Sequence, residues 1–233
     1  MNKYPSNSFV SNTMRLLANF SSYIFHPLLV LFYSLFLLLC LNPHLFGSMH
    51  WSEQSLLLIL LFIYTCLVPA IGFALLRFTG FIQSFEMRER TDRFGPLIIC
   101  AVFYLWMYVN LKSQEQIPRL MICFILASII SIFLAFAINT KVKISLHSIA
   151  FGAFIAFWVL LRFNNLNEAV LNFRFIKTGL SAFNVNHLIV ISCVLGGWIG
   201  TCRLYLKAHT AEELYLGYLV GIISSILAFS YIF

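Results

Sequence analysis

The sequence predicts an all-α protein, a polytopic membrane helical bundle of six to seven transmembrane helices, and three observations lead to this fold class. First, 61% of the 233 residues are hydrophobic and only 10% are charged, whereas soluble domains carry about 25% charged residues. Second, the apolar residues gather in blocks close to the length of a membrane-crossing helix, roughly 17–25 residues. Third, these blocks show no alternation of polar and apolar residues, which excludes the strands of a membrane β-barrel.

Seven apolar blocks are the expected spans. In order they are about Phe20–Leu41, Ser55–Leu76, Pro96–Leu111, Leu120–Ile138, Ser145–Leu161, His187–Leu206 and Leu214–Phe233. The third and fifth blocks are short, so six spans with one tilted or re-entrant piece is the alternative count. We expect Pro69 to kink the second span, because proline breaks the helical hydrogen-bond ladder. Gly196, Gly197 and Gly200 give the sixth span a small-residue face for close helix packing.

The sequence predicts a single transmembrane domain at 20–233 after a polar N-terminal lead at 1–19. No internal repeat or low-complexity linker divides it. The first apolar block is long enough to span a membrane and lacks a small-residue cleavage site, so we expect it to be retained. The six cysteines lie in or beside apolar blocks without a CxxC pair, and we expect them to pack as small apolar side chains.

The chain carries 15 basic and 8 acidic residues, a formal net charge of +7. The basic residues are scattered between apolar blocks and form no stripe, so nucleic acid is not an expected partner. With seven spans, ten basic residues lie on one face and five on the other. The ten-residue face holds the N-terminus and the loops Arg77–Gly95, Asn139–Ile144 and Tyr205–Glu213.

Three polar clusters lie on that face, each at the end of a predicted span. They are Arg88 to Pro96 at the start of the third span, Lys141 to His147 before the fifth, and Arg203 to Glu213 before the seventh. Two spans separate each cluster from the next, so all three reach the same side of the membrane. Taken singly, each is also compatible with a simple anchor in the headgroup layer or a helix cap. Their convergence favours a functional site.

The third cluster contains the most specific pattern. His209 and Glu213 are one helical turn apart, where the carboxylate can accept a hydrogen bond from the imidazole. That bond fixes the tautomer and leaves the other ring nitrogen free as a nucleophile or base. Fixed Arg and Lys side chains around such a histidine are suited to a phosphate group. No cluster of carboxylates or imidazoles for Mg²⁺ or Zn²⁺ is evident in the sequence, so we expect no metal and no other cofactor.

These residues resemble the signatures of the type 2 phosphatidic acid phosphatase superfamily of integral membrane lipid phosphatases, in a divergent bacterial branch. The third signature, Ser-Arg-x5-His-x3-Asp, is matched by Cys202, Arg203, His209 and Glu213. The second, Pro-Ser-Gly-His, is matched more loosely by Ser145-Leu146-His147. The first, Lys-x6-Arg-Pro, is matched approximately by Arg88 or Arg90, Arg93 and Pro96. Tyr23-Ile24-Phe25-His26-Pro27-Leu28 also resembles the opening of that branch.

The resemblance implies that His209 attacks phosphorus to form a phosphohistidine, oriented by Glu213. His147 would protonate the leaving lipid oxygen and then activate water. The implied phosphate-binding residues are Arg203, Arg93, Arg90, Arg88, Lys143 and Ser145. Because Glu86 stands seven positions before Arg93, the cation of the first signature is expected from Arg88, Arg90 or Lys143.

The implied protein is a phosphatase that hydrolyses a phosphate monoester or diphosphate on a lipid, without a metal. Its expected partners are the phosphorylated lipid and the bilayer. A lipid phosphotransferase with the same intermediate and a non-catalytic anionic-lipid binder or transporter are the alternatives. The resemblance places the active site at the periplasmic face of a bacterial inner membrane. Without the five candidate phosphate-binding cations, each face carries five basic residues, so charge gives no orientation. The sequence does not indicate an oligomeric state.

Overall fold

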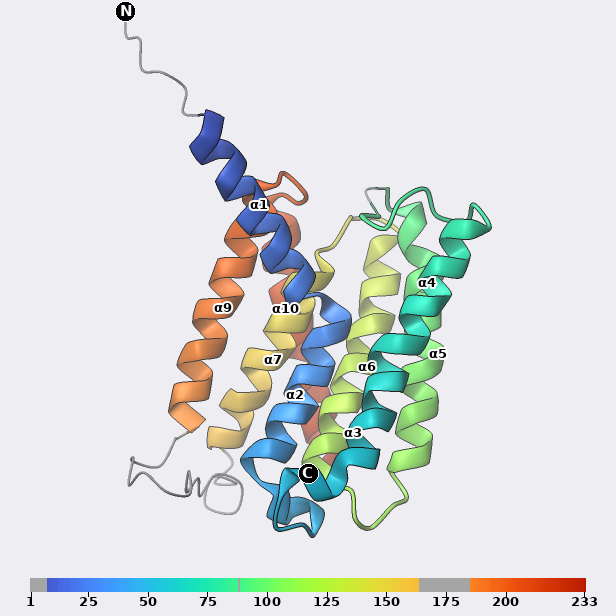
Figure 1. The fold of residues 1–233 in the computed structure, drawn as a ribbon, viewed down its shortest axis with the longest axis vertical. Coiled ribbons are helices and arrows are strands. Elements are labelled where there is room, and N and C mark those ends of the chain that lie inside the picture. The colour runs from blue at the N-terminus through green and yellow to red at the C-terminus, as the bar shows by residue number, and fades with distance from the viewer. Residues whose placement is uncertain (1–7, 88, 164–184) are drawn as a thin grey trace, which may run out of the picture.

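The computed structural model describes residues 8–87, 89–163 and 185–233, and within these ranges it is a bundle of α-helices without a strand (Figure 1). The helices are α1 (Ser8–Ile24), α2 (Pro27–Leu41), α3 (Ser55–Phe62), α4 (Val68–Phe78), α5 (Phe94–Leu111), α6 (Arg119–Asn139), α7 (Leu146–Phe163), α9 (Val185–Tyr205) and α10 (Ala211–Ile232).

Six helical segments of the described chain are long and apolar enough to cross a membrane. They are Trp51–Phe78, Thr91–Leu111, Arg119–Asn139, Leu146–Phe163, Val185–Tyr205 and Ala211–Ile232. The count rises to seven if the bent pair Asn12–Ile24 and Pro27–Leu41 forms one span. The predicted all-α membrane bundle of six to seven spans is therefore confirmed.

The first predicted span is broken, and the prediction of one helix over Phe20–Leu41 was wrong. Helices α1 and α2 meet at an angle of 58°. Pro27 is the cause, because a proline disfavours helical backbone at the preceding residue. His26 accordingly has extended backbone (φ −62°, ψ 141°), and its side chain caps α2. Helix α1 also begins at Ser8, inside the predicted polar lead.

The effect of Pro69 takes the form of a π-helical turn, Ile63–Leu67, that joins α3 to α4. Pro69 has no N–H with which to bond the carbonyl of Thr65, four residues earlier. That carbonyl accepts a hydrogen bond from the hydroxyl of Tyr104 on α5 at 3.3 Å. The backbone group released by the proline thus links two neighbouring helices.

Helices α7 and α10 pack backbone against backbone. A Cβ atom on Gly152 of α7 would overlap the backbone of Tyr218, and one on Gly221 of α10 would overlap the backbone of α7. Only residues without a side chain allow this approach. The contact also joins the first turns of the two helices, where the amide of Ser145 donates to the carbonyl of Glu213 at 3.4 Å.

The small-residue face predicted for the sixth span is present on α9 at two of its three glycines. A Cβ on Gly196 would meet Ile155, and one on Gly200 would meet the hydroxyl of Tyr218, whereas Gly197 faces open space. The Tyr218 hydroxyl donates to the carbonyl of Gly196 at 2.6 Å. Helix α9 is therefore held against both α7 and α10.

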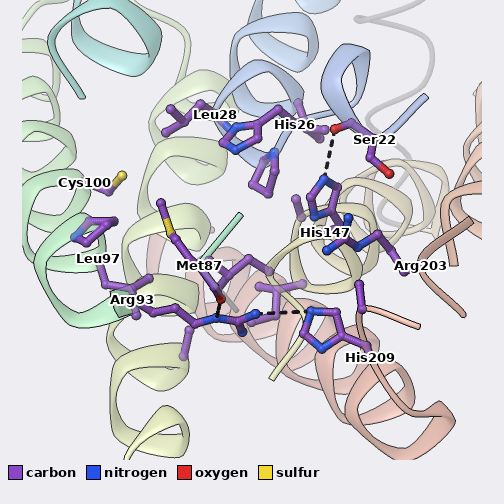
Figure 2. A pocket seen from close by; sticks show the side chains of 18 of the residues that line it. Ser22, His26, Leu28, Met87, Arg93, Leu97, Cys100, His147, Arg203 and His209 are labelled. Atoms are coloured by element: carbon purple, nitrogen blue, oxygen red, sulfur yellow. Dashed lines mark hydrogen bonds between the residues drawn. The ribbon is translucent and has the colours of Figure 1, made fainter. Parts of the chain in front are cut away.

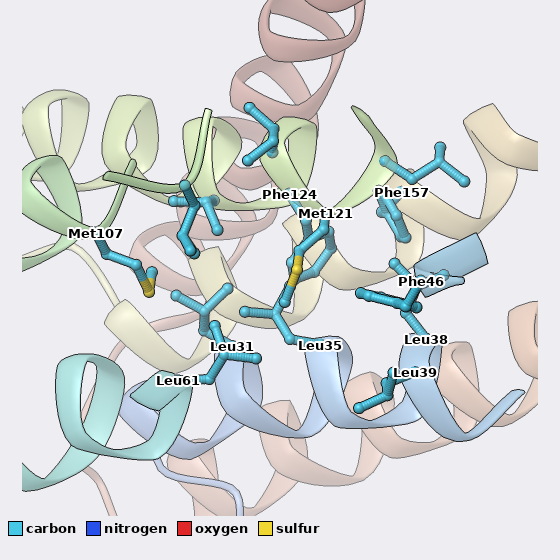
Figure 3. Packing of buried hydrophobic residues seen from close by; sticks show 14 of the residues in the cluster. Leu31, Leu35, Leu38, Leu39, Phe46, Leu61, Met107, Met121, Phe124 and Phe157 are labelled. Carbon is cyan, nitrogen blue, oxygen red and sulfur yellow. The ribbon is translucent and has the colours of Figure 1, made fainter. Parts of the chain in front are cut away.

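The three polar clusters lie at one end of the bundle, as the span count predicted. The α4–α5, α6–α7 and α9–α10 connections meet at the upper end of Figure 1, beside α1. The other half is filled by apolar side chains, including Leu35, Leu38, Met121 and Phe157 (Figure 3). The fold thus combines a solid apolar half with a polar end.

Candidate functional site

A cavity of about 530 Å³ opens at the polar end of the bundle. Its polar wall holds Arg15, Asn19, His26, Glu86, Arg93, Lys143, His147, Arg203, Lys207 and His209. Its apolar wall continues along α5 to Tyr104 and along α6 to Phe124. Tyr104 lies eleven positions after Arg93, which corresponds to about 16 Å at 1.5 Å per residue. The cavity therefore connects a cationic mouth with an apolar interior.

His209 lies directly before α10 and is buried, with 7% of its surface exposed. Its Nδ1 atom donates to Oε2 of Glu213 at 2.7 Å, so the predicted pair is present. Glu213 and Thr210 also form a capping box, in which each side chain bonds the backbone of the other residue. The N-terminus of α10 therefore fixes the Glu213 carboxylate, and this carboxylate in turn orients the ring of His209.

The other ring nitrogen of His209 faces Arg93. Because Glu213 occupies Nδ1, the neutral ring carries its lone pair on Nε2, which lies 3.4 Å from Nη2 of Arg93. Burial and the nearby guanidinium lower the pKa of His209 from 6.5 to about 4, against the opposing effect of the bond to Glu213. His209 is thus neutral at pH 7, with its lone pair beside a cation.

Arg93 is buried and its guanidinium is fixed from three sides. Nη1 donates to the carbonyl of Ile144 at 2.5 Å, and Nε donates to the carbonyl of Met87 at 3.2 Å. The third contact is with His209. These bonds join the first predicted cluster to the second and the third, so Arg93 holds the three connections together.

Lys143 and Arg203 add two more cations to the wall. The ammonium of Lys143 donates to the carbonyl of Ala208 at 3.2 Å, and burial beside Arg93 lowers its pKa. Within the described chain, Nε of Arg203 is a buried donor without a hydrogen-bond partner. Such a donor is costly unless a ligand satisfies it. An anion in the cavity would provide an acceptor.

His147 is the second residue of α7. Its Nε2 atom lies 3.1 Å from the carbonyl oxygen of Ser22 in α1. A carbonyl oxygen can only accept, so Nε2 carries the hydrogen, and the neutral ring has its lone pair on Nδ1. The guanidinium of Arg203 lies between His147 and His209 (Figure 2).

Two predicted phosphate-binding residues that the structure describes, Arg90 and Ser145, do not line this cavity. The exposed Arg90 donates from Nη1 to the carbonyls of Thr140 and Lys141, at 3.0 and 2.6 Å, and so fixes the α6–α7 connection. Ser145 is fully buried, and its hydroxyl oxygen accepts hydrogen bonds from Ser148. Arg88 lies outside the described residues.

Other wall residues were not predicted from the sequence. Arg15 and Asn19 come from α1, His26 from the α1–α2 break, and Lys207 from the α9–α10 connection. The His-Pro dipeptide was the available signal for the break. Five cations and one carboxylate, that of Glu86, are among the wall residues described, so the site favours an anionic ligand.

A metal has no evident place among the described residues, because they contain no group of three or more His, Cys, Asp or Glu side chains that could hold an ion. Comparisons of the chain with protein-family models, with characterised proteins and with solved structures find no match.

Proposed function

We propose that the protein is an integral membrane lipid phosphatase of the type 2 phosphatidic acid phosphatase superfamily. In this proposal it hydrolyses a phosphate monoester or diphosphate on a lipid through a phosphohistidine, without a metal. The observation that carries the proposal is the arrangement at His209. Its desolvated, neutral ring is oriented by Glu213 and directs a lone pair toward a cationic cavity. A nucleophilic catalyst requires such a base and orienting group.

In the first half-reaction, Nε2 of His209 attacks phosphorus and forms the N–P bond. The bond between phosphorus and the lipid oxygen breaks, and its electron pair stays on that oxygen. The oxygen takes a proton from Nδ1 of His147, which acts from its doubly protonated form. Arg93 and Arg203 neutralise the charge that develops on the phosphoryl oxygens, as cations do in phosphoryl transfer.

In the second half-reaction, the neutral His147 takes a proton from water through Nδ1. The water oxygen attacks phosphorus, the P–N bond breaks, and its electron pair returns to Nε2 of His209. Glu213 accepts a hydrogen bond from Nδ1 throughout and stabilises the positive ring of the phosphohistidine. The products are phosphate and the lipid alcohol, or a lipid monophosphate if the substrate is a diphosphate.

The shape of the cavity supports a lipid-borne phosphate. Its cationic mouth continues into an apolar interior between α2, α5 and α6, where Leu31, Tyr104 and Phe124 line the wall. A soluble sugar phosphate would gain nothing from this apolar surface, whereas a hydrocarbon chain would be transferred from one apolar environment to another.

The central test compares wild type with His209→Ala on a panel of phosphatidic acid, phosphatidylglycerol phosphate and prenyl diphosphates in liposomes. We expect phosphate release by wild type, its loss in His209→Ala, and an acid-labile phosphorylated residue in wild type only. His50→Ala, an exposed histidine at the other end of the bundle, is the matched control. Wild-type turnover without His209 would refute the mechanism, and complete inhibition by EDTA would refute metal independence. Transfer of the phosphoryl group to an added alcohol would identify the phosphotransferase alternative.

The proposal places the polar end on the periplasmic side of a bacterial inner membrane. Single cysteines at Gln83, in the α4–α5 connection, and at Gln114, in the α5–α6 connection, lie at opposite ends of the bundle and are exposed. With the exposed Cys193 replaced by serine, a membrane-impermeant thiol reagent applied to whole cells should label position 83 and not position 114. Labelling of position 114 alone would reverse the orientation.

A further inference from the structure

His26 lies in the wall of the same cavity, although no residue of the three polar clusters is near it in sequence. It occupies the break between α1 and α2 and forms the N-cap of α2. Its Nδ1 atom accepts a hydrogen bond from the amide of Leu28 at 3.4 Å. The break therefore points a half-buried imidazole at a cationic pocket and fixes one of its two nitrogens.

The cap also determines the tautomer of His26. Because Nδ1 accepts from a backbone amide, the neutral ring carries its proton on Nε2. Among the described residues, none accepts a hydrogen bond from this Nε2. His26 thus presents an N–H donor that no residue in the described part of the chain uses.

The rings of His26 and His147 meet edge to face, with centroids 5.8 Å apart and planes at 81°. Both rings are set by the same short segment, since Ser22 accepts the Nε2 hydrogen of His147 and the break positions His26. The segment leaves His147 with a lone pair on Nδ1 and His26 with a hydrogen on Nε2. An oxygen atom bound beside both rings could exchange a proton with Nδ1 of His147 and accept a hydrogen bond from Nε2 of His26.

This pair lies on the side of Arg203 away from His209, as Figure 2 shows. In an in-line displacement the leaving oxygen departs opposite to the attacking atom. A phosphoryl group held by Arg203 and attacked by His209 would therefore direct its leaving oxygen toward His26 and His147.

We propose that His26 is a further catalytic residue, which donates a hydrogen bond from Nε2 to the leaving oxygen beside His147. The inference rests on the proposed phosphatase function. As the bond between phosphorus and the leaving oxygen breaks, its electron pair stays on the oxygen, and the proton comes from His147. His26 retains its own proton and stabilises the negative charge on the oxygen until that transfer is complete. A fixed donor at an atom that gains charge in the transition state accelerates the reaction.

His26→Asn separates this role from the structural one. Asparagine is among the best N-cap residues, so its side-chain oxygen can still accept from Leu28, whereas its shorter amide does not reach the position of Nε2. The substrates are dodecyl phosphate, whose alkoxide is a poor leaving group, and p-nitrophenyl phosphate, whose phenolate needs no such help. His147→Asn is the contrasting variant, because it removes both the proton donor and the base that activates water, and it should lower kcat on both substrates.

We expect His26→Asn to lower kcat on dodecyl phosphate about 10- to 100-fold, as for a lost hydrogen bond to a charged group, and to change kcat on p-nitrophenyl phosphate less than threefold. Wild-type rates on both substrates would show that His26 acts only as a helix cap. This result would overturn the inference and leave the proposed function standing. Equal losses on both substrates would make His26 a structural residue and also overturn the inference. If wild type hydrolyses neither phosphate nor any lipid of the panel, the proposed function itself is wrong and the inference falls with it.

Discussion

Glu213→Gln isolates the charge of the carboxylate that holds His209. The two side chains are joined by a 2.7 Å hydrogen bond. Glutamine also suits the capping box, so we expect the start of α10 to persist and Tm to stay within about 1 °C of wild type. A hydrogen bond to a charged group contributes about 1.5–3 kcal/mol and a neutral one about 0.5–1.5 kcal/mol. The difference is about 1–1.5 kcal/mol, and in the proposed mechanism it applies to the positive phosphohistidine. Because 1.4 kcal/mol corresponds to a factor of ten, we expect kcat to fall roughly tenfold.

The assay is phosphate release from the best lipid of the panel, in liposomes, at saturating substrate. Glu212→Gln is the matched control, because Glu212 is the exposed neighbour in the same helical turn and loses the same charge. Glu213→Ala removes the acceptor as well, and we expect it to lose roughly a hundredfold in kcat and to lower Tm, since a capping interaction is worth about 1 kcal/mol. Equal rates for Glu213→Gln and Glu212→Gln would refute the orienting role of Glu213.

Two further predictions concern helix packing and the charge around His209. Gly221→Ala should lower Tm by several degrees in a detergent melt, because its methyl group meets the backbone of α7 and overpacking costs about 1–3 kcal/mol. Gly197→Ala, with open space beside it, should keep or raise Tm, and a fall as large as that of Gly221→Ala would contradict the packing argument. Arg93→Gln should raise the pKa of His209 from about 4 toward 6.5, since a neighbouring cation disfavours the protonated ring, and an unchanged NMR titration of that imidazole would refute the assignment.

Local spacing made part of the site predictable. His209 and Glu213 are four residues apart at a helix N-terminus, and a helical turn alone brings such a pair together. The shared membrane face of the three clusters follows from the even number of spans between them. The contact of Arg93 with His209 lies within that expectation, although the sequence could not select Arg93 from its neighbours. Its burial depends on the carbonyl of Ile144 in the α6–α7 connection, which only the folded chain brings to it.

The remaining differences have a common physical origin. Arg90 was predicted to bind phosphate, but its guanidinium is engaged by backbone carbonyls at the C-terminal end of α6. An isolated cation in a sequence does not reveal which acceptor it meets. The α1–α2 break was missed because hydropathy treats His26 and Pro27 as a brief interruption of an apolar run, whereas the backbone restriction that proline imposes decides the geometry.

The contact between α7 and α10 has a consequence for sequence divergence. His147 belongs to the first helix and His209 precedes the second, so the separation of the two histidines depends on backbones that touch directly. The separation of the two histidines does not depend on side-chain rotamers elsewhere in the bundle. Lipid-facing residues can therefore be exchanged freely as long as Gly152 and Gly221 stay small. A chain built this way can change most of its lipid-facing residues and still keep two imidazoles at a fixed interval.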